Sequence, residues 1–137
     1  MTQKYLNELT FKIIGTAIEV HKELGPGLLE SIYEKCMMHL LKEQGLHVIS
    51  QQKVPLNFKG FYLECDLRFD LLVENAIIVE IKAIDGLQPI HGAQLLTYLR
   101  LLEKPKGILI NFNCTNIYKE GQKTIVTDVY AKLPKGY

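Results

Sequence analysis

Apolar residues recur at the spacing of an α-helix in three parts of the chain. The first part covers residues 9–24, and the Gly-Pro-Gly sequence at residues 25–27 ends it, with Gly25 suited to a left-handed C-cap. The second covers residues 29–44, where one face carries the apolar side chains that would pack into a core. The third covers residues 90–102 and ends before a proline. The pattern therefore predicts three helices.

Between the second and third helices the apolar spacing changes toward two, which is typical of strands. A later segment is almost wholly apolar, as expected of a strand that is buried on both faces. Strands are predicted at residues 48–54, 56–59, 61–66, 67–73, 77–83, 107–112 and 124–130, the last followed by a frayed tail. This order of elements indicates an α/β (α+β) fold, in which a mixed β-sheet is flanked by helices.

The composition fits one globular domain over residues 1–137, with 47% hydrophobic and 23% charged residues. The net charge is +1, so binding of nucleic acid or a membrane would need a local basic patch. Cys36, Cys65 and Cys114 are widely spaced and lack zinc-site spacing, so reduced thiols are expected. Without a signal peptide or an apolar run of ~20 residues, we expect a cytoplasmic protein with no membrane segment.

Charged residues interrupt the two most hydrophobic predicted strands. Asp70, Glu80 and Lys82 stand where the fold alone would favour valine or isoleucine. Carboxylates and ammonium groups are rarely buried unless they are paired or bind a metal. We therefore treat these three residues as a candidate site.

The loop between these strands decides whether the site forms. If residues 74–76 make a three-residue loop, Asp70 lies opposite Glu80, and Arg68 lies opposite Lys82. The two carboxylates would then be about 5 Å apart at Cβ, beside two cations. A two-residue loop would instead send Glu80 to the other face and destroy the site.

Two carboxylates this close need a positive partner, and magnesium takes one or two carboxylates together with water and phosphate. Such a metal polarises a phosphoryl oxygen and activates water, and Lys82 would orient or deprotonate that water or balance the phosphate charge. Acid-x-Lys pairs also arise by chance in a chain of this composition. Spacing alone therefore leaves open a hairpin with a solvated charged face.

Further sequence blocks accompany the acidic hairpin. Residues 27–33 match the pattern G-x-x-E-x-x-Y. Other blocks are Arg68-x-Asp70-Leu71-Leu72-Val73, Val79-Glu80-Ile81-Lys82-Ala83, Ile90-His91-x-Ala93-Gln94-Leu95-Leu96-x-Tyr98-Leu99 and Gly107-Ile108-Leu109-Ile110-Asn111-Phe112. In these blocks the chain resembles, over residues 8–130, the GxxExxY proteins, a bacterial and archaeal group of the PD-(D/E)xK nuclease superfamily.

The resemblance implies a restriction-endonuclease-like core, a bound Mg²⁺ or Mn²⁺, and nucleic acid as the partner. It implies metal ligation by Asp70, Glu80, Glu30 and the backbone carbonyl of Ile81. It implies catalytic roles for Asp70, Glu80, Lys82, Gln94 and Glu30, with Gln94 positioning water or phosphate. Candidate contacts to substrate phosphate are Arg68, His91 and Tyr98.

Four of these blocks' residues also have simpler structural explanations. Glu30 complements the dipole at a helix N-terminus as readily as it ligates a metal. Tyr33 fits a core aromatic with its hydroxyl bonded better than it fits a catalytic group. His91 would help to start a helix. Gln94 would be either solvated or, if it faces the sheet, in need of a partner.

Three functions are weighed. The first is a metal-dependent nuclease that hydrolyses phosphodiester bonds of DNA or RNA. The second is a catalytically silent module that keeps the fold and binds nucleic acid or a protein. The third is a structural homodimer.

Dispersed basic residues could border the site: Lys53, Lys59, Arg68, Lys104, Lys106, Lys119 and Lys123.

Overall fold

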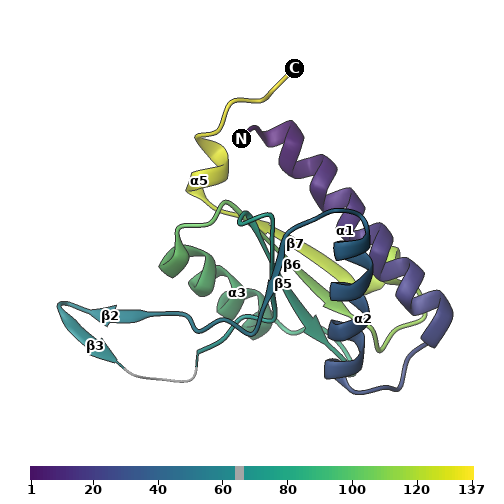
Figure 1. Ribbon diagram of the computed structural model, residues 1–137. Helices are drawn as coiled ribbons and strands as arrows, with labels where there is room; N and C mark the ends of the chain where they lie inside the picture. Colours follow the sequence, from purple (N-terminus) through teal and green to yellow (C-terminus); the bar gives the residue numbers. More distant parts are fainter. Residues whose placement is uncertain (64–66) are drawn as a thin grey trace.

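The computed structural model describes residues 1–63 and 67–137 (Figure 1). The helices are α1 (Gln3–Leu24), α2 (Glu30–Glu43), α3 (Pro89–Leu102), α4 (Ile117–Glu120) and α5 (Asp128–Ala131). The strands are β1 (Val48–Ser50), β2 (Leu56–Phe58), β3 (Phe61–Leu63), β4 (Leu71–Val73), β5 (Ile77–Lys82), β6 (Lys106–Asn111) and β7 (Gln122–Val126).

A five-stranded sheet in the order β1-β4-β5-β6-β7 forms the centre of the molecule. Strands β5 and β6 are parallel and are joined through α3, whereas the other neighbours are antiparallel. Every residue of β6 is buried, including Lys106 and Asn111 at its ends. Strands β2 and β3 form a separate two-stranded sheet, which projects from the body in Figure 1.

Helices cover both faces of the five-stranded sheet. Leu71, Ile77 and Val79 belong to a hydrophobic cluster that includes residues of α1 and α2. Leu72 and Ile78, which alternate with them, belong to a second cluster with α3. The predicted fold class, a mixed sheet flanked by helices, is confirmed.

Several predicted boundaries were wrong. Strand β1 stops at Ser50 because Gln51 has a φ of 52°, outside the strand region. Helix α1 begins at Gln3, because the Thr2 hydroxyl accepts a hydrogen bond from the Tyr5 amide. Strand β3 starts at Phe61 as predicted, and residues 64–66, the rest of the predicted strand, lie outside the described residues.

The C-terminal region also differs from the prediction. Strand β7 ends at Val126, and the next residues form the short helix α5 rather than more strand. The expected frayed tail is bonded to the start of α1, where the Gln3 amide donates to the Pro134 carbonyl at 2.8 Å. Cys36 and Cys114 are free thiols, as expected, and Cys65 lies outside the described residues. Within residues 1–63 and 67–137, no helix is both long and apolar enough to cross a membrane.

Candidate functional site

The loop between β4 and β5 has the length that the site requires. Val73 pairs with Ile77 and Leu71 pairs with Val79, which is the register of the three-residue loop. Glu74 and Asn75 both have left-handed φ values, of 52° and 53°. Asparagine tolerates this conformation because its side chain bonds locally. The predicted register is therefore confirmed.

Asp70 contacts Glu80 just beyond the last residue pair of β4 and β5, Leu71 and Val79. The Asp70 amide donates to Glu80 Oε1 at 3.1 Å, and the Ile81 amide donates to Asp70 Oδ2 at 2.7 Å. The Asp70 side chain thus takes the place of the next ladder partner for β5. This arrangement fixes both carboxyl groups at the carboxyl end of β5, beside the parallel strand β6.

Glu80 is 7% exposed. Burial, and after it the neighbouring negative charge of Asp70, raise the pKa of Glu80 to about 8, although the positive charge of Lys82 acts in the opposite direction. Lys82 lies two residues along β5, on the same face of the strand as Glu80. In the absence of a cation, the site therefore favours a protonated Glu80 at neutral pH.

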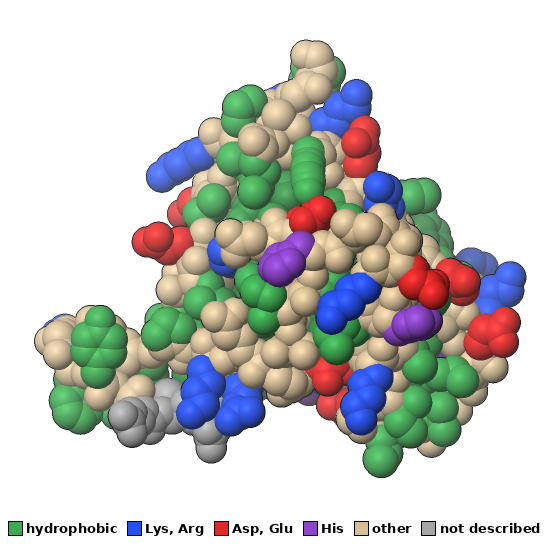
Figure 2. All heavy atoms as spheres, in the orientation of Figure 1, with side chains coloured by type: hydrophobic (Ala, Val, Ile, Leu, Met, Phe, Trp, Pro, Cys, Tyr) green, Lys and Arg blue, Asp and Glu red, His purple; other side chains and the backbone are tan. Residues whose placement is uncertain are grey.

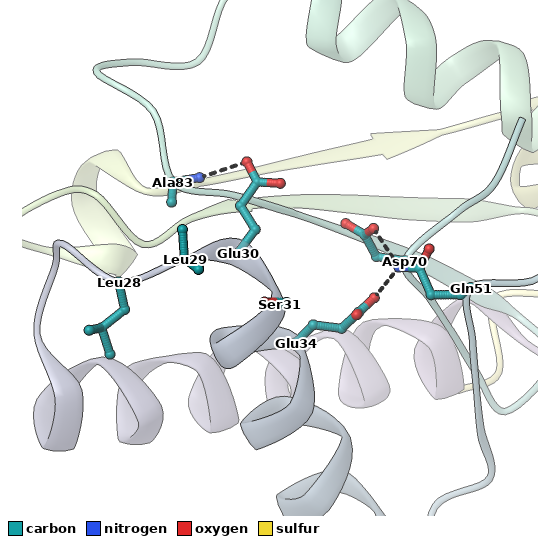
Figure 3. A pocket seen from close by; sticks show the side chains of 8 residues that line it. All are labelled: Leu28, Leu29, Glu30, Ser31, Glu34, Gln51, Asp70 and Ala83. Atoms are coloured by element: carbon teal, nitrogen blue, oxygen red, sulfur yellow. Dashed lines mark hydrogen bonds between the residues drawn. The ribbon is translucent and has the colours of Figure 1, made fainter. Parts of the chain in front are cut away.

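A cavity of about 550 Å³ lies between the start of α2 and this end of the sheet. Figure 3 shows the Asp70, Glu34 and Gln51 side chains directed toward one another on one side of it. Gln51 Nε2 donates to Glu34 Oε1 at 2.6 Å and to Asp70 Oδ1 at 3.2 Å. One amide therefore joins two carboxylates from different elements.

Glu30 lies on the other side of the same cavity. It is the first residue of α2, and its Oε1 accepts a hydrogen bond from the Ala83 amide at 3.2 Å. The side chain therefore connects the helix to the residue that follows β5, rather than capping its own helix. Glu30 and Asp70 both line the cavity.

Two residues of the cavity, Glu34 and Gln51, were not predicted from the sequence. Glu34 follows Glu30 by four residues, so helical geometry places both on one face of α2, and this spacing could have identified it. Burial raises the pKa of Glu34, the Gln51 hydrogen bond lowers it, and the charge of Asp70 raises it. No sequence pattern marked Gln51.

Asn111 shapes the segment that follows β5. Its buried side chain accepts from the Ile84 amide at 3.1 Å and donates to the Ile84 carbonyl at 3.0 Å. The Phe112 amide donates to the Lys82 carbonyl at 2.9 Å. The end of β6 therefore holds the backbone on both sides of Ala83 in place.

Helix α3 carries three of the candidate residues. His91 Nδ1 accepts from the Gln88 amide at 2.8 Å, so it stabilises the start of the helix. Gln94 is exposed, and its Nε2 donates to the hydroxyl of the buried Tyr98 at 3.0 Å. Between described residues, no hydrogen bond links Gln94 to Asp70, Glu80 or Lys82. Its proposed contact with water or phosphate stays a prediction.

The predicted opposition of Arg68 and Lys82 was wrong. Arg68 lies opposite Lys53, because pairing between β4 and β5 ends at Leu71. Two other basic residues do not border the site. Lys104 Nζ donates to Asn75 in the β4–β5 loop at 2.9 Å, and the buried Lys106 donates to Asn7 at 2.8 Å.

Tyr33 is a core residue, as expected. Its ring stacks on Phe112 with centroids 4.3 Å apart. Its buried hydroxyl donates to the Gly25 carbonyl at 2.6 Å and accepts from the Leu28 amide at 3.1 Å. The last residue of the GxxExxY pattern thus fixes the loop that leads to Glu30.

Tyr33→Phe is expected to destabilise the protein by about 1–3 kcal/mol, because two backbone groups lose a partner while the ring stays in place. Urea unfolding followed by circular dichroism measures this change. Tyr5→Phe, at a more exposed tyrosine of α1, is the control and should be near neutral. An equal effect of the two substitutions would show that the Tyr33 hydroxyl does not hold the loop.

The donor set of the site fits a hard divalent cation. Asp70 and Glu80 offer carboxylate oxygens in contact, and magnesium needs one or two carboxylates with water completing its shell. A cation would also stabilise the ionised form of Glu80, which burial disfavours. Among the described residues, no three His, Cys, Asp or Glu side chains already converge as a closed metal site.

Comparison with known proteins identifies a family for this chain. Neither the curated proteins nor the solved structures contain a match to this chain. Residues 7–125 match the family model described as the PD-(D/E)XK nuclease superfamily. The match covers most of the chain, including both carboxylates and Lys82. The protein therefore belongs to the PD-(D/E)XK nuclease superfamily.

Proposed function

We propose that this protein is a metal-dependent nuclease of the GxxExxY type, which hydrolyses phosphodiester bonds of DNA or RNA. The hydrogen bonds of Asp70 to Glu80 and to the Ile81 amide, with Lys82 two residues beyond Glu80 along β5, carry the proposal. Membership of the superfamily supports the reaction class. We further propose a single domain over residues 1–137 that acts in the cytoplasm. A homodimer stays a prediction.

Asp70, Glu80 and the Ile81 carbonyl would hold Mg²⁺ or Mn²⁺. When bound, the metal would supply a polarised phosphoryl oxygen and a more acidic water. Lys82 would orient or deprotonate the attacking water, or balance the charge on the phosphate. Glu30, which bonds to the Ala83 amide, would keep α2 against the end of β5 or join the ligand set.

Other residues would support this site. Gln51 would hold Asp70 Oδ1 in position through its amide. Gln94 would help to place water or phosphate from α3. Arg68, His91 and Tyr98 would contact substrate phosphate, although His91 and Tyr98 already have the structural partners described above. The Asp70–Glu80 pair is accordingly the core of the proposal.

The test is a cleavage assay with single- and double-stranded DNA and RNA, with Mg²⁺ or Mn²⁺ and then with chelator. We expect cleavage that needs the metal and is lost in Glu80→Ala. Glu8→Ala, at an exposed position of α1, is the matched control and should cleave normally.

Cleavage that persists in chelator or in Glu80→Ala would contradict the proposal. Binding without cleavage of any of the four substrates would indicate the catalytically silent module instead. If the protein neither binds nor cleaves any of these substrates, the result would indicate the structural homodimer instead.

A further inference from the structure

The β2–β3 hairpin, residues 56–63, carries three aromatic side chains that are largely exposed to solvent. Phe58 is 62% exposed, Phe61 is 63% exposed and Tyr62 is 73% exposed. The hairpin extends away from the sheet and the helices (Figure 1), and Figure 2 shows hydrophobic side chains on its surface. We refer to residues 56–63 as the arm.

The packing within the arm contributes little to its stability. A two-stranded hairpin is marginally stable in water without a packed face. Phe58 lies opposite Phe61, and Leu56 lies opposite Leu63, so these four side chains form one apolar face, on which the two phenylalanines are largely exposed. Exposed aromatic groups of this kind commonly mark interaction surfaces. The arm is therefore suited to contact another molecule.

The charge of the arm favours an anionic partner. Lys59 occupies the turn, and its Nζ lies 5.8 Å from the centre of the Phe58 ring. Lys53 and Arg68 lie opposite each other where the arm meets the body. Residues 52–63 contain no Asp or Glu, while Glu64 and Asp66 fall outside the described part of the chain. Aromatic rings interspersed with cations characterise surfaces that bind single-stranded nucleic acid.

The chain segments that flank the arm meet at the candidate site. Gln51 lies on the segment that leads into the arm, and Asp70 lies just after the segment that leads back from it. The backbone amide of Gln51 donates to the backbone carbonyl of Asp70 at 2.9 Å. The same two residues are joined through their side chains. A strand of nucleic acid held on the arm would therefore extend toward the cavity beside Asp70.

We propose that the arm binds single-stranded DNA or RNA, with unpaired bases stacking on Phe58 and Phe61, which share one face of the hairpin, and Lys59 contacting phosphate. The identity of the polymer rests on the function proposed above. The aromatic rings carry no base-specific hydrogen bonds, so the arm binds many sequences. Its role is to hold the strand beside the site while leaving the reaction to other residues.

The experiment measures binding in chelator, so that it does not depend on cleavage. Fluorescence anisotropy follows labelled single-stranded DNA and RNA and the matching duplexes. Phe61→Leu should weaken single-strand binding about tenfold, because it keeps an apolar side chain but removes the stacking surface. Phe61→Trp should bind like the wild type, and Phe11→Ala, at an 80% exposed phenylalanine of α1, should also do so.

Lys59→Gln provides a second variant that leaves the apolar face intact. It should weaken binding at low salt and reduce the salt dependence by about one counterion. Equal binding by wild type, Phe61→Leu and Lys59→Gln would overturn the proposal, as would a failure of the wild type to bind single strands. Loss of self-association in Phe61→Ala, with unchanged oligonucleotide binding, would overturn it in favour of a dimer contact.

The outcomes separate this inference from the proposed function. Binding that depends on the arm, without cleavage under any metal condition, supports the arm and contradicts the nuclease. Metal-dependent cleavage that is unaffected by the arm substitutions supports the nuclease and contradicts the arm.

Discussion

The metal-free protein is expected to lose stability as the pH rises from about 4.5 toward 8, and Glu80→Gln is expected to remove most of this loss. The cause is the buried carboxyl of Glu80, whose pKa is raised from 4.5 to about 8, mainly by burial and then by the charge of Asp70. Glutamine keeps an oxygen that accepts from the Asp70 amide, but it does not titrate. The substitution therefore removes the charge without removing the hydrogen bond.

The direction follows from proton binding. Between these two pH values the folded state holds a proton on Glu80 that the unfolded chain has released. The stabilising contribution is complete below the unfolded pKa and is lost as the pH rises through the folded pKa. A shift of this size corresponds to a loss on the order of 3–5 kcal/mol in the free energy of unfolding. Glu34 contributes in the same direction, so a smaller slope remains in Glu80→Gln.

Urea unfolding at a series of pH values in chelator gives the comparison. Glu8→Gln, at an exposed position of α1, is the matched control and should follow the wild-type curve. Added Mg²⁺ should stabilise the wild type more at pH values near 8 than near 6, because ligation needs an ionised carboxylate. Parallel curves for wild type and Glu80→Gln would show that the carboxyl is hydrated in solution.

The pairing of Asp70 with Glu80 could be predicted because local rules decide it. Asn75 tolerates the left-handed backbone of the loop, and the loop length then fixes which residues of β4 and β5 oppose each other. The alternation of side chains along β5 places Lys82 beside Glu80 in the same way. The contact between Asp70 and Glu80 therefore follows from a few neighbouring residues.

The surroundings of the pair depend on contacts between distant segments, which local rules do not determine. Gln51 reaches Glu34 and Asp70 only because α2 packs beside the end of β1, and its positive φ has no sequence signal. Arg68 does not lie opposite Lys82, as had been predicted, because a side-chain oxygen of Asp70 replaces the next backbone partner of β5. A side chain that completes a strand ladder changes the pairing beyond it.

The arm and the C-terminus illustrate the same difference. The two strands of the arm were predicted, and Lys59 and Gly60, both with positive φ, form the turn between them. The exposure of the arm's rings could not be predicted, because alternating apolar residues normally indicate a strand with one buried face. Helix α5 was missed because its apolar residues fit either structure, and hydrogen bonds such as Ala131 amide to Thr127 carbonyl decide for a helical turn.

Lys82→Ala is expected to lower the cleavage rate by about 10²–10⁴-fold while leaving single-strand binding in chelator nearly unchanged. The position is half-buried at the end of β5, and the charge of Lys82 already opposes the rise in the pKa of Glu80. Alanine should therefore raise the Glu80 pKa further and reduce metal affinity at neutral pH. Isothermal titration with Mg²⁺ alone measures that affinity apart from turnover.

Lys82→Arg separates the two chemical roles of the lysine. Arginine keeps the positive charge but stays protonated at any accessible pH, so it cannot act as a base. If Lys82 deprotonates water, Lys82→Arg should be as slow as Lys82→Ala, with metal affinity close to the wild type. If the lysine only balances charge, arginine should restore much of the rate. Lys42→Ala, at an exposed lysine of α2, should change neither quantity, and a wild-type rate in Lys82→Ala would remove this residue from the mechanism.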